Sequence, residues 1–358
     1  MVNPTVIHAS DLTDRQLALW SEIQRSDRTL SSPFFRPEFT QAVASVRRDV
    51  YVAELKDNGQ TVGFFPFCKG RMNVGRPVGQ PLCDFQGIIG RTDRSWNDAE
   101  FICRCGLAAW DFDHLLCSQA VFNSRQHRPE ESPLIDMSNG FAAYRQDKQS
   151  QGTNLFRDMA RKARKMGREI GPLRFELNAS DPTLLRTVIQ WKSDQSRRAG
   201  TFDVFRWNWP QRLLESILAH RAEAFGGVLS VLRAGETVAA IHMGMRSGSV
   251  LHWWFPTYNG ALAKYSPGLI LLLYLLRQTE EIGIKRVDLG KGDEIYKRRF
   301  MTGGEMVAVG SIESSRITRM IRKVRRTSAA ILRSSPLAHS FRRAARLVRF
   351  GEKWLKYR

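Results

Sequence analysis

The chain has 358 residues and a formal net charge of +20, and 42% of its residues are hydrophobic. This length favours two domains, and the apolar content is enough to build packed cores, which excludes a globally disordered chain. The charge is uneven, because residues 316–358 hold 14 Lys and Arg and one acid, so the other 315 residues carry only +7. We therefore expect a mildly basic folded body and a strongly basic tail.

All five cysteines lie in the first third of the chain, at irregular spacings. An odd, irregular set is not a disulfide framework, and Cys103 and Cys105 have no second pair at zinc-ligand spacing, so we expect no metal. The N-terminus lacks a basic stretch leading into an apolar segment, and the longest apolar run, 269–276, is too short to span a membrane. The sequence predicts a reduced, cytoplasmic protein.

The first 150 residues have the pattern of a mixed α/β domain. Asn58-Gly59 separates two apolar runs, which is the strongest short-range signal for a β-hairpin. The predicted elements are helices at 17–23, 38–46 and 97–110, and strands at 50–55, 61–68, 113–118 and 134–137.

The second half predicts another α/β unit. Apolar residues recur at helical spacing among basic ones in 154–169, so this helix should pack on its neighbours and expose a basic face, part of which could touch an anionic ligand. Asp181-Pro182 is a typical helix start. The elements that follow are strands at 173–177, 227–233, 238–246, 250–255, 285–290 and 305–313, and helices at 182–198, 211–224, 269–283 and 295–300.

Residues 316–350 repeat apolar residues among many arginines, and Pro336 divides the segment. This pattern predicts two basic amphipathic helices. Two interpretations stay open: a solvated appendage, or attachment to an anionic membrane face.

Two segments of the second half resemble a known family. HWWFPTYNGALAKYSPGLILLLYLL (252–276) joins an aromatic strand to a P-x-Y-x-x-x-x-x-x-x-S-P-G loop, and VDLGKGDEIYKRRF (287–300) carries D-x-G-x-G-D-x-x-Y-K. In this order they resemble the GNAT-like acetyltransferases of polysaccharide and cellulose biosynthesis (CelD-type). GRPVGQPLCDFQG (75–87) looks like the first half of the same family. The whole chain resembles the tandem GNAT arrangement of FemABX-type peptidoglycan aminoacyl transferases.

This resemblance implies an α/β (α+β) fold of two GNAT-like domains, each with a mixed, mostly antiparallel sheet flanked by helices. We expect the first domain at 1–150, the second at 151–315 with a linker helix at 150–170, and the basic helical tail at 316–358.

The resemblance also places an acyl donor, acetyl-CoA or a longer acyl-CoA, where strand 250–255 diverges from its parallel neighbour 285–290. The loop before the next helix would surround a pyrophosphate with backbone N–H groups. Ser266 can cap that helix, Gly268 permits close backbone approach, and Lys264 supplies charge. An ordinary capped, buried helix is the alternative. The loop departs from the common Gly-rich acetyl-CoA motif, to which only Lys264 and Gly268 correspond, at another spacing.

Acyl transfer needs a base near the acceptor and an acid for the leaving thiolate. The base candidates are two strand histidines, His242 and His252, and two acids that end or follow a strand, Asp288 and Asp293. By resemblance, Tyr296 is the candidate acid. Structural roles for the histidines and plain packing of the tyrosine are the alternatives.

Aromatic residues gather beside the expected donor site. Trp254 and Phe255 would line an acyl channel or, with Tyr258, stack on sugar faces; alternation along a strand means that about half of such residues pack in the core. Lys297 follows Tyr296 and is expected at the substrate side, and Tyr258 is a second candidate for the acid. In the first half, Asp84 and Gln86 interrupt apolar runs, and they either hold an acceptor or form a hydrogen-bonded turn.

Three functions compete. The first is acyl transfer to a saccharide or lipid-linked envelope precursor at the inner membrane face. The second is aminoacyl transfer from charged tRNA, which the basic charge favours and the absence of sustained heptads for a coiled-coil arm disfavours. The third is an inactive GNAT scaffold that binds anionic polymer, membrane or nucleic acid. The oligomeric state is left open.

Overall fold

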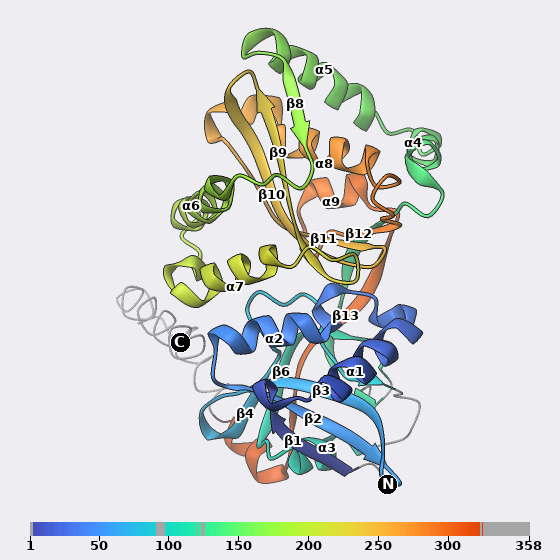
Figure 1. Cartoon of the computed structure of the whole chain (residues 1–358), viewed down its shortest axis with the longest axis vertical. Helices are drawn as coiled ribbons and strands as arrows, with labels where there is room; N and C mark the ends of the chain where they lie inside the picture. Colours follow the sequence, from blue (N-terminus) through green and yellow to red (C-terminus); the bar gives the residue numbers. More distant parts are fainter. Residues whose placement is uncertain (1–2, 91–96, 120, 123–125, 323, 325–358) are drawn as a thin grey trace. The chain divides into compact units, whose positions relative to one another are not determined.

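The computed structural model describes residues 3–90, 97–119, 121–122, 126–322 and 324 (Figure 1). Its contacts divide the chain into two compact units. Unit 1 comprises Met1–Ser26, Val43–Pro129 and Val307–Arg358, and unit 2 comprises Asp27–Ala42 and Glu130–Met306.

Unit 1 is built on strands in the order β1–β2–β3–β4–β6–β13, with β5 paired to β3. Strands β2 and β3 form the predicted hairpin, and Asn58 (φ 49°) and Gly59 (φ 83°) take the left-handed conformations that its tight turn requires. The strands are β1 (Asn3–His8), β2 (Val50–Asp57), β3 (Gln60–Lys69), β4 (Val74–Arg76), β5 (Ile89–Gly90), β6 (Ala109–Leu116) and β13 (Gly303–Glu313), the last from Val307 on.

The predicted helix at 97–110 is wrong in its second half. Helix α3 ends at Arg104, and Gly106 (φ 69°) terminates it in a left-handed conformation before β6 begins. The core of the unit packs Phe65, Trp110 and Phe122 with ring centroids 5.0 to 6.3 Å apart. The helices of unit 1 are α1 (Asp14–Ser26), α3 (Asp98–Arg104), η1 (Ala9–Asp11) and η4 (Arg71–Asn73).

Unit 2 is built on strands in the order β7–β12–β11–β10–β9–β8. The predicted antiparallel meander β9–β10–β11 is confirmed, and β12 pairs parallel to β11 and antiparallel to β7. The strands are β7 (Gln126–Asp136), β8 (Leu173–Glu176), β9 (Gly226–Ala234), β10 (Thr237–Ser247), β11 (Val250–Tyr258) and β12 (Arg286–Asp288).

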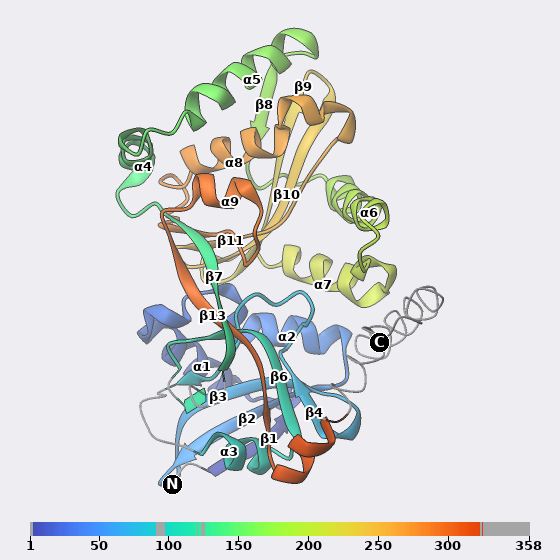
Figure 2. The ribbon, with the colours of Figure 1, turned by 180° about the vertical axis from the view of Figure 1, so that it is seen from behind.

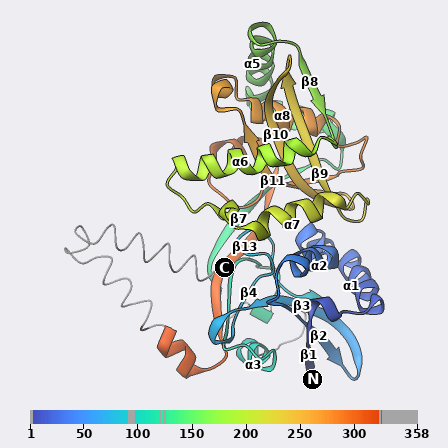
Figure 3. The ribbon, with the colours of Figure 1, turned by 60° about the vertical axis from the view of Figure 1, so that its left-hand side comes forward.

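Helices cover both faces of this sheet. In Figures 2 and 3, α6 and α7 lie on one face of β9–β11 and α8 on the other, with α5 beside α8. The core on the α8 side joins that helix to α4, α5 and the buried Leu251 and Trp253 of β11. The helices are α2 (Pro37–Val46, to Ala42 in this unit), α4 (Gly140–Ser150), α5 (Leu155–Glu169), α6 (Pro182–Arg198), α7 (Asn208–Ala219), α8 (Pro267–Arg277), α9 (Ile295–Phe300), η2 (Arg28–Leu30), η3 (Pro33–Phe35), η6 (Val204–Arg206) and η7 (Gly260–Tyr265).

Two expectations about boundaries differ from the structure. The expected boundary at 150 falls inside unit 2, because β7 pairs with β12 and brings residues 130–150 into this unit. The expected 256–268 loop is partly ordered, since β11 continues to Tyr258 and η7 follows. The tail beyond residue 324 lies outside the described residues, and 316–322 are helical. No described helix is both long and apolar enough to cross a bilayer.

Candidate active site

Strands β11 and β12 pair at three positions and then separate. The pairs are Val250–Arg286, Leu251–Val287 and His252–Asp288. Beyond them β11 continues along β10, whereas the chain after Asp288 turns to β7, where the Leu289 N–H donates to the Pro133 carbonyl. The predicted divergence is therefore confirmed. It leaves the central part of β11 without a parallel neighbour, which is the geometry that lets an extended ligand arm lie against a strand.

A bulge distorts β11 at the same point. In the β10–β11 ladder, Met243 pairs with Phe255 and Met245 with His252, so Trp253 and Trp254 stand opposite the single residue Gly244. A Cβ at Gly244 would lie 2.5 Å from the His242 ring, so a side chain there would displace the imidazole. Bulges of this kind re-aim side chains next to functional sites.

His242 and His252 are both fully buried at this bulge. The His242 ring stacks on Trp253, with centroids 3.9 Å apart, and neither of its nitrogens has a side-chain hydrogen-bond partner among the described residues. Burial, then the neighbouring His252, lowers the His242 pKa well below its usual value, so this imidazole is neutral at pH 7. Ser230, opposite His242 on β9, also has a buried hydroxyl without a partner. His252 packs edge-on against Phe34 at 4.9 Å.

Asp288 marks the end of the β11–β12 pairing and is 1% exposed. One carboxylate oxygen accepts from Arg286 Nε at 2.5 Å, and Oδ2 has no partner in the part of the chain that the structure describes. Arg286 is also 3.8 Å from Glu305. Burial raises the pKa of Glu305. The Arg286 guanidinium opposes this shift, and the Asp288 carboxylate adds to it. A buried, unpaired carboxylate oxygen is costly, so a ligand or water donor is expected to meet it.

Lys192, on α6, is a residue that sequence reasoning did not select. Burial lowers its pKa to about 8; Glu294 opposes this shift and Lys297 adds to it. Lys192 in turn contributes to the low pKa of His242. An amine with this pKa is partly neutral near physiological pH, so it can accept a proton.

Tyr296, the predicted acid, lies on α9 and packs against the unit 2 core. Burial and then Glu294 raise its pKa, and a hydrogen bond with Trp253 opposes the shift. The phenol is therefore protonated at neutral pH, as a proton donor must be. The hydrogen bond to Trp253 ties Tyr296 to the bulge on β11.

The start of α8 is the predicted phosphate site. Pro267 occupies the first turn as expected, but the side-chain cap predicted for Ser266 is wrong. Ser266 has a left-handed backbone (φ 54°), and its carbonyl instead accepts from the N–H groups of Leu269 and Ile270. The Ser266 hydroxyl accepts from Lys162 Nζ of α5 at 2.7 Å. Amide, hydroxyl and ammonium donors thus meet at one helix start.

Gly268 lies in this first turn of α8. A Cβ built on it would come 3.7 Å from the Tyr258 ring, an ordinary contact, so glycine leaves open space there. Lys264 is exposed and pairs with Glu169 at 3.3 Å, and Tyr265 donates to the same carboxylate. The predicted positive charge of Lys264 is therefore partly neutralised.

The aromatic residues of β11 mostly pack against other rings. Trp254 lies 5.6 Å from Phe34 and 4.7 Å from Phe255, and Phe255 lies 5.3 Å from Phe205. Trp254 and Phe255 are each partly exposed, and Tyr258 is 47% exposed. The exposed edges of these rings are accessible to a ligand. The parts of Trp254 and Phe255 that pack against neighbouring rings are not.

Two predicted site residues have other roles in the structure. Asp293 is fully exposed, 3.7 Å from Arg298, so water screens its charge and it lacks the burial that a tuned base needs. Lys297 is buried, and its ammonium contacts the Gly290 and Lys291 carbonyls at 3.0 Å and Glu294 at 3.1 Å. Those contacts use its three N–H donors, so Lys297 closes the 290–294 turn and has no donor left for a substrate.

In unit 1, Gln86 is also consumed by the fold. Its Oε1 accepts from the Asp113 and His114 N–H groups at 3.0 and 3.1 Å, and its Nε2 donates to Asp113 at 2.6 Å and to the Cys83 carbonyl at 3.3 Å. Asp84 lies 3.5 Å from His114. This geometry favours the hydrogen-bonded turn over an acceptor site at Gln86.

Sequence reasoning missed Lys192, Lys162 and the Arg286–Glu305 pair. Lys162 reaches a serine 104 residues away, and Lys192 is half-buried on a helix that packs against strands that follow it in the chain. The one available signal for Lys192 was its place in the middle of a helix that begins at a strong cap. Among the described residues, no cluster of three or more His, Cys, Asp or Glu side chains is arranged to hold a metal.

This fold and site define a class of protein. Residues 154–298 match the family described as "Acetyltransferase (GNAT) domain". The matched stretch runs from α5 to α9 and contains the strand divergence, Lys192, His242 and Tyr296. This stretch of unit 2 therefore resembles a GNAT acetyltransferase domain in sequence, and its fold is GNAT-like.

Solved structures resemble the whole chain. FemX aligns with a TM-score of 0.58 at 9% identity, covering 89% of this chain and 99% of that one. A tandem GNAT protein from the clavulanic acid biosynthesis pathway aligns with a TM-score of 0.50 at 8% identity, covering 88% and 99%. The chain has a mixed α/β, GNAT-like fold, as the sequence predicted. No curated protein matches the sequence.

Proposed function

We propose that unit 2 catalyses acyl transfer from a thioester donor to an amine or hydroxyl of a saccharide or a cell-envelope precursor. The observation that carries this proposal is the divergence of β11 from β12 next to Tyr296 and Lys192, within residues that match a GNAT domain. In balanced form, the acceptor X–H and R–CO–S–carrier give X–CO–R and carrier–SH.

Lys192 is the base in this proposal. Its pKa of about 8 leaves a fraction of neutral amine at pH 7, and the acceptor's proton passes to this nitrogen as the acceptor attacks. Glu294 stabilises the ammonium that results. His242 is neutral and buried with both nitrogens unpaired, so it supplies a hydrogen bond to orient a bound group, while its low pKa makes it a weak base.

Tyr296 is the acid. Its raised pKa keeps the phenol protonated, and its proton passes to the leaving thiolate sulfur. The hydrogen bond to Trp253 holds it beside the bulge on β11. Asp288, with one oxygen unpaired, is placed to accept a hydrogen bond from a donor on the acceptor.

An acyl-CoA fits the donor side. The start of α8 offers the Gly268 N–H, the Ser266 hydroxyl and the Lys162 ammonium, a set that suits a pyrophosphate, and Gly268 leaves space beside them. When bound, acyl-CoA supplies the activated acyl group. The exposed ring of Tyr258 supports a sugar acceptor, because aromatic faces stack on sugar rings.

Aminoacyl transfer from charged tRNA, in the FemABX manner, is the second candidate. Two observations favour it: the loop before α8 departs from the Gly-rich acetyl-CoA motif, and FemX shares the fold. We further propose a cytoplasmic protein that associates peripherally with the inner membrane face through its basic tail, where lipid-linked precursors would be accessible.

The test is calorimetric titration of the full chain with acetyl-CoA and longer acyl-CoAs, followed by thiol release with a panel of amino sugars and sugars. We expect submillimolar binding of at least one acyl-CoA and thiol release that depends on an acceptor. Absence of binding at millimolar concentrations would contradict an acyl-CoA donor. Aminoacyl transfer from charged tRNA in a parallel assay would then support the second candidate.

A further inference from the structure

Helix α5 presents a continuous basic face to solvent. It has six Lys and Arg and two acids in 15 residues. At 3.6 residues per turn, the five exposed cations span only about 100° of arc. They are Arg157, Arg161, Arg164, Lys165 and Arg168. The opposite side of the helix buries Leu155, Met159 and Met166 in the unit 2 core.

Most of the charges on this face are not neutralised within the described part of the chain. Asp158 faces Arg299 at 3.5 Å, and Glu169 pairs with Lys165 of this face and with Lys264, and accepts from Tyr265. Within the described part of the chain, Arg161, Arg164 and Arg168 form no ion pair. The face therefore complements an anionic partner.

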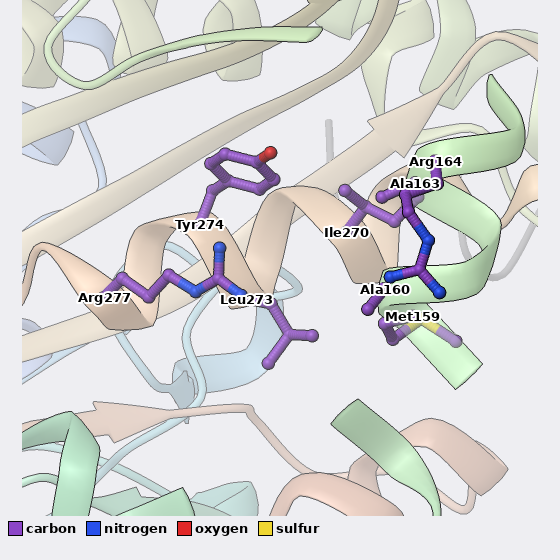
Figure 4. Close-up of a pocket in the computed structure, with 8 residues that line it drawn as sticks. All are labelled: Met159, Ala160, Ala163, Arg164, Ile270, Leu273, Tyr274 and Arg277. Carbon is purple, nitrogen blue, oxygen red and sulfur yellow. The ribbon is translucent and has the colours of Figure 1, made fainter. Parts of the chain in front are cut away.

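A groove of about 190 Å³ adjoins this face, between α5 and α8. Its floor is apolar, and Figure 4 shows Arg164 of α5 and Arg277 of α8 at the two ends of the lining side chains. Arg277 is held over the rings of Phe141 and Tyr274 at 5.7 and 5.3 Å and forms no ion pair with a described residue. The lining residues are Met159, Ala160, Ala163, Arg164, Ile270, Leu273, Tyr274 and Arg277.

We propose that this groove binds an anionic phospholipid of the membrane surface. One acyl chain enters between α5 and α8, and the phosphate contacts Arg164 at one end of the groove. The volume holds about six methylene groups, each close to the roughly 30 Å³ of a water molecule, so only one end of a chain is buried. The remaining arginines of α5 lie against neighbouring anionic headgroups.

The apolar groove distinguishes a lipid from a nucleic acid. RNA would satisfy the arginines through phosphates, but its polar backbone gains nothing from a groove lined by Met159, Ala163 and Leu273. A phospholipid satisfies both features at once. The groove does not include Lys192 or Tyr296, and its lining begins beside Lys162 and Gly268 of the proposed donor site on the same two helices.

The direct test is calorimetric titration of the full chain with dodecyl phosphate below its micelle concentration. We expect saturable binding at one site, which Ala163→Trp abolishes by filling the groove and Arg164→Glu weakens about tenfold. Glycerol phosphate, which lacks the chain, and dodecyltrimethylammonium, which lacks the anion, should not bind there. Equal binding by the wild-type chain and both variants would overturn the proposal.

Vesicle binding tests whether the anionic phospholipid that occupies the groove comes from a membrane. Phosphatidylcholine vesicles with added phosphatidylglycerol should lose about tenfold in affinity for the Arg161→Glu/Arg164→Glu chain. The matched control, Arg186→Glu/Arg212→Glu on α6 and α7, changes the net charge equally and should bind like wild type. Identical losses in both variants would show non-specific charge attraction and overturn the proposal. A loss confined to tRNA binding, with vesicle binding unchanged, would identify α5 as a nucleic-acid surface instead.

Discussion

Each unit contains a cluster of buried or half-buried polar side chains, and the two clusters differ in how they are satisfied. In unit 1, Gln86 makes four hydrogen bonds around Asp113 and His114. In unit 2, both nitrogens of His242 and one oxygen of Asp288 are buried without side-chain partners among the described residues.

This difference distinguishes polar groups that stabilise the fold from polar groups that remain available to a ligand. A satisfied network recovers the cost of burial within the protein, whereas an unsatisfied buried group costs about 1–3 kcal/mol that a ligand can offset. The shifted groups around His242, namely Lys192 and Tyr296, strengthen the assignment, because perturbed pKa values gather at sites of chemistry. We therefore propose the unit 2 cluster as the site, whereas the unit 1 cluster holds a turn.

The largest expected effect is on Lys192. Lys192→Met should reduce kcat by about 10²–10⁴-fold, because it removes the base, while the circular dichroism spectrum stays unchanged. Steady-state thiol release measures it. Lys285→Met, at an exposed lysine of unit 2, is the control and should retain wild-type kcat. Wild-type turnover in Lys192→Met would remove this residue from the mechanism.

Tyr296→Phe should reduce kcat by about 10²-fold, since the ring packing is kept and only the proton donor is lost. The effect should be smaller with donors whose thiol leaves easily, such as aryl thioesters, because those need less protonation. Tyr51→Phe in unit 1 should show neither effect. An equal loss with both types of donor would assign Tyr296 a packing role.

Gln86→Leu should disrupt the hydrogen-bonded cluster of unit 1 without affecting the proposed acyl transfer. It leaves the Asp113 and His114 N–H groups without their acceptor, at a cost of about 2–3 kcal/mol. We expect a lower melting temperature and an unchanged KM for the acceptor. A raised KM with normal stability would restore the substrate-binding role that the sequence suggested.

The smallest effect concerns acid stability. Burial alone would raise the Asp113 pKa, but hydrogen bonding and charge from His114, with Gln86 and Gln80, lower it to about 2. A carboxyl with a depressed pKa stabilises the fold above its unfolded pKa, near 4. This contribution is lost as pH falls through about 2. Because the group is partly exposed, we expect roughly 1 kcal/mol. Asp113→Asn should weaken the dependence of the melting temperature on pH over this range. An acid transition identical to that of the wild type would contradict this prediction.

Local signals in the sequence predicted much of the fold. The Asn58-Gly59 turn, the Asp181-Pro182 helix start and the unit 2 meander all occur as expected, because short-range chemistry determines them. Strand β1 and helix α4 were not predicted. β1 has a weak pattern and gains its order by pairing with β2, and α4 is held by contacts such as Tyr144 to the distant Phe300 carbonyl.

The site was predicted less completely. Tyr296, Asp288 and the two histidines lie at the divergence, because motif and strand order place them there. Asp293 and Lys297, although close to Tyr296 in sequence, face solvent and the turn respectively, and side-chain direction in or just before a six-residue helix cannot be read from spacing. The burial of Lys192 depends on long-range packing of α6 against β10 and β11.

The pH dependence of kcat tests the central claim most directly. With Lys192 as the base, the neutral amine is the active form, so thiol release should rise with pH and level off above the Lys192 pKa of about 8. Lys192→Met should lose this rise and keep only a low rate at every pH. An identical rising limb in wild type and Lys192→Met would contradict the assignment of the unit 2 cluster as the catalytic site.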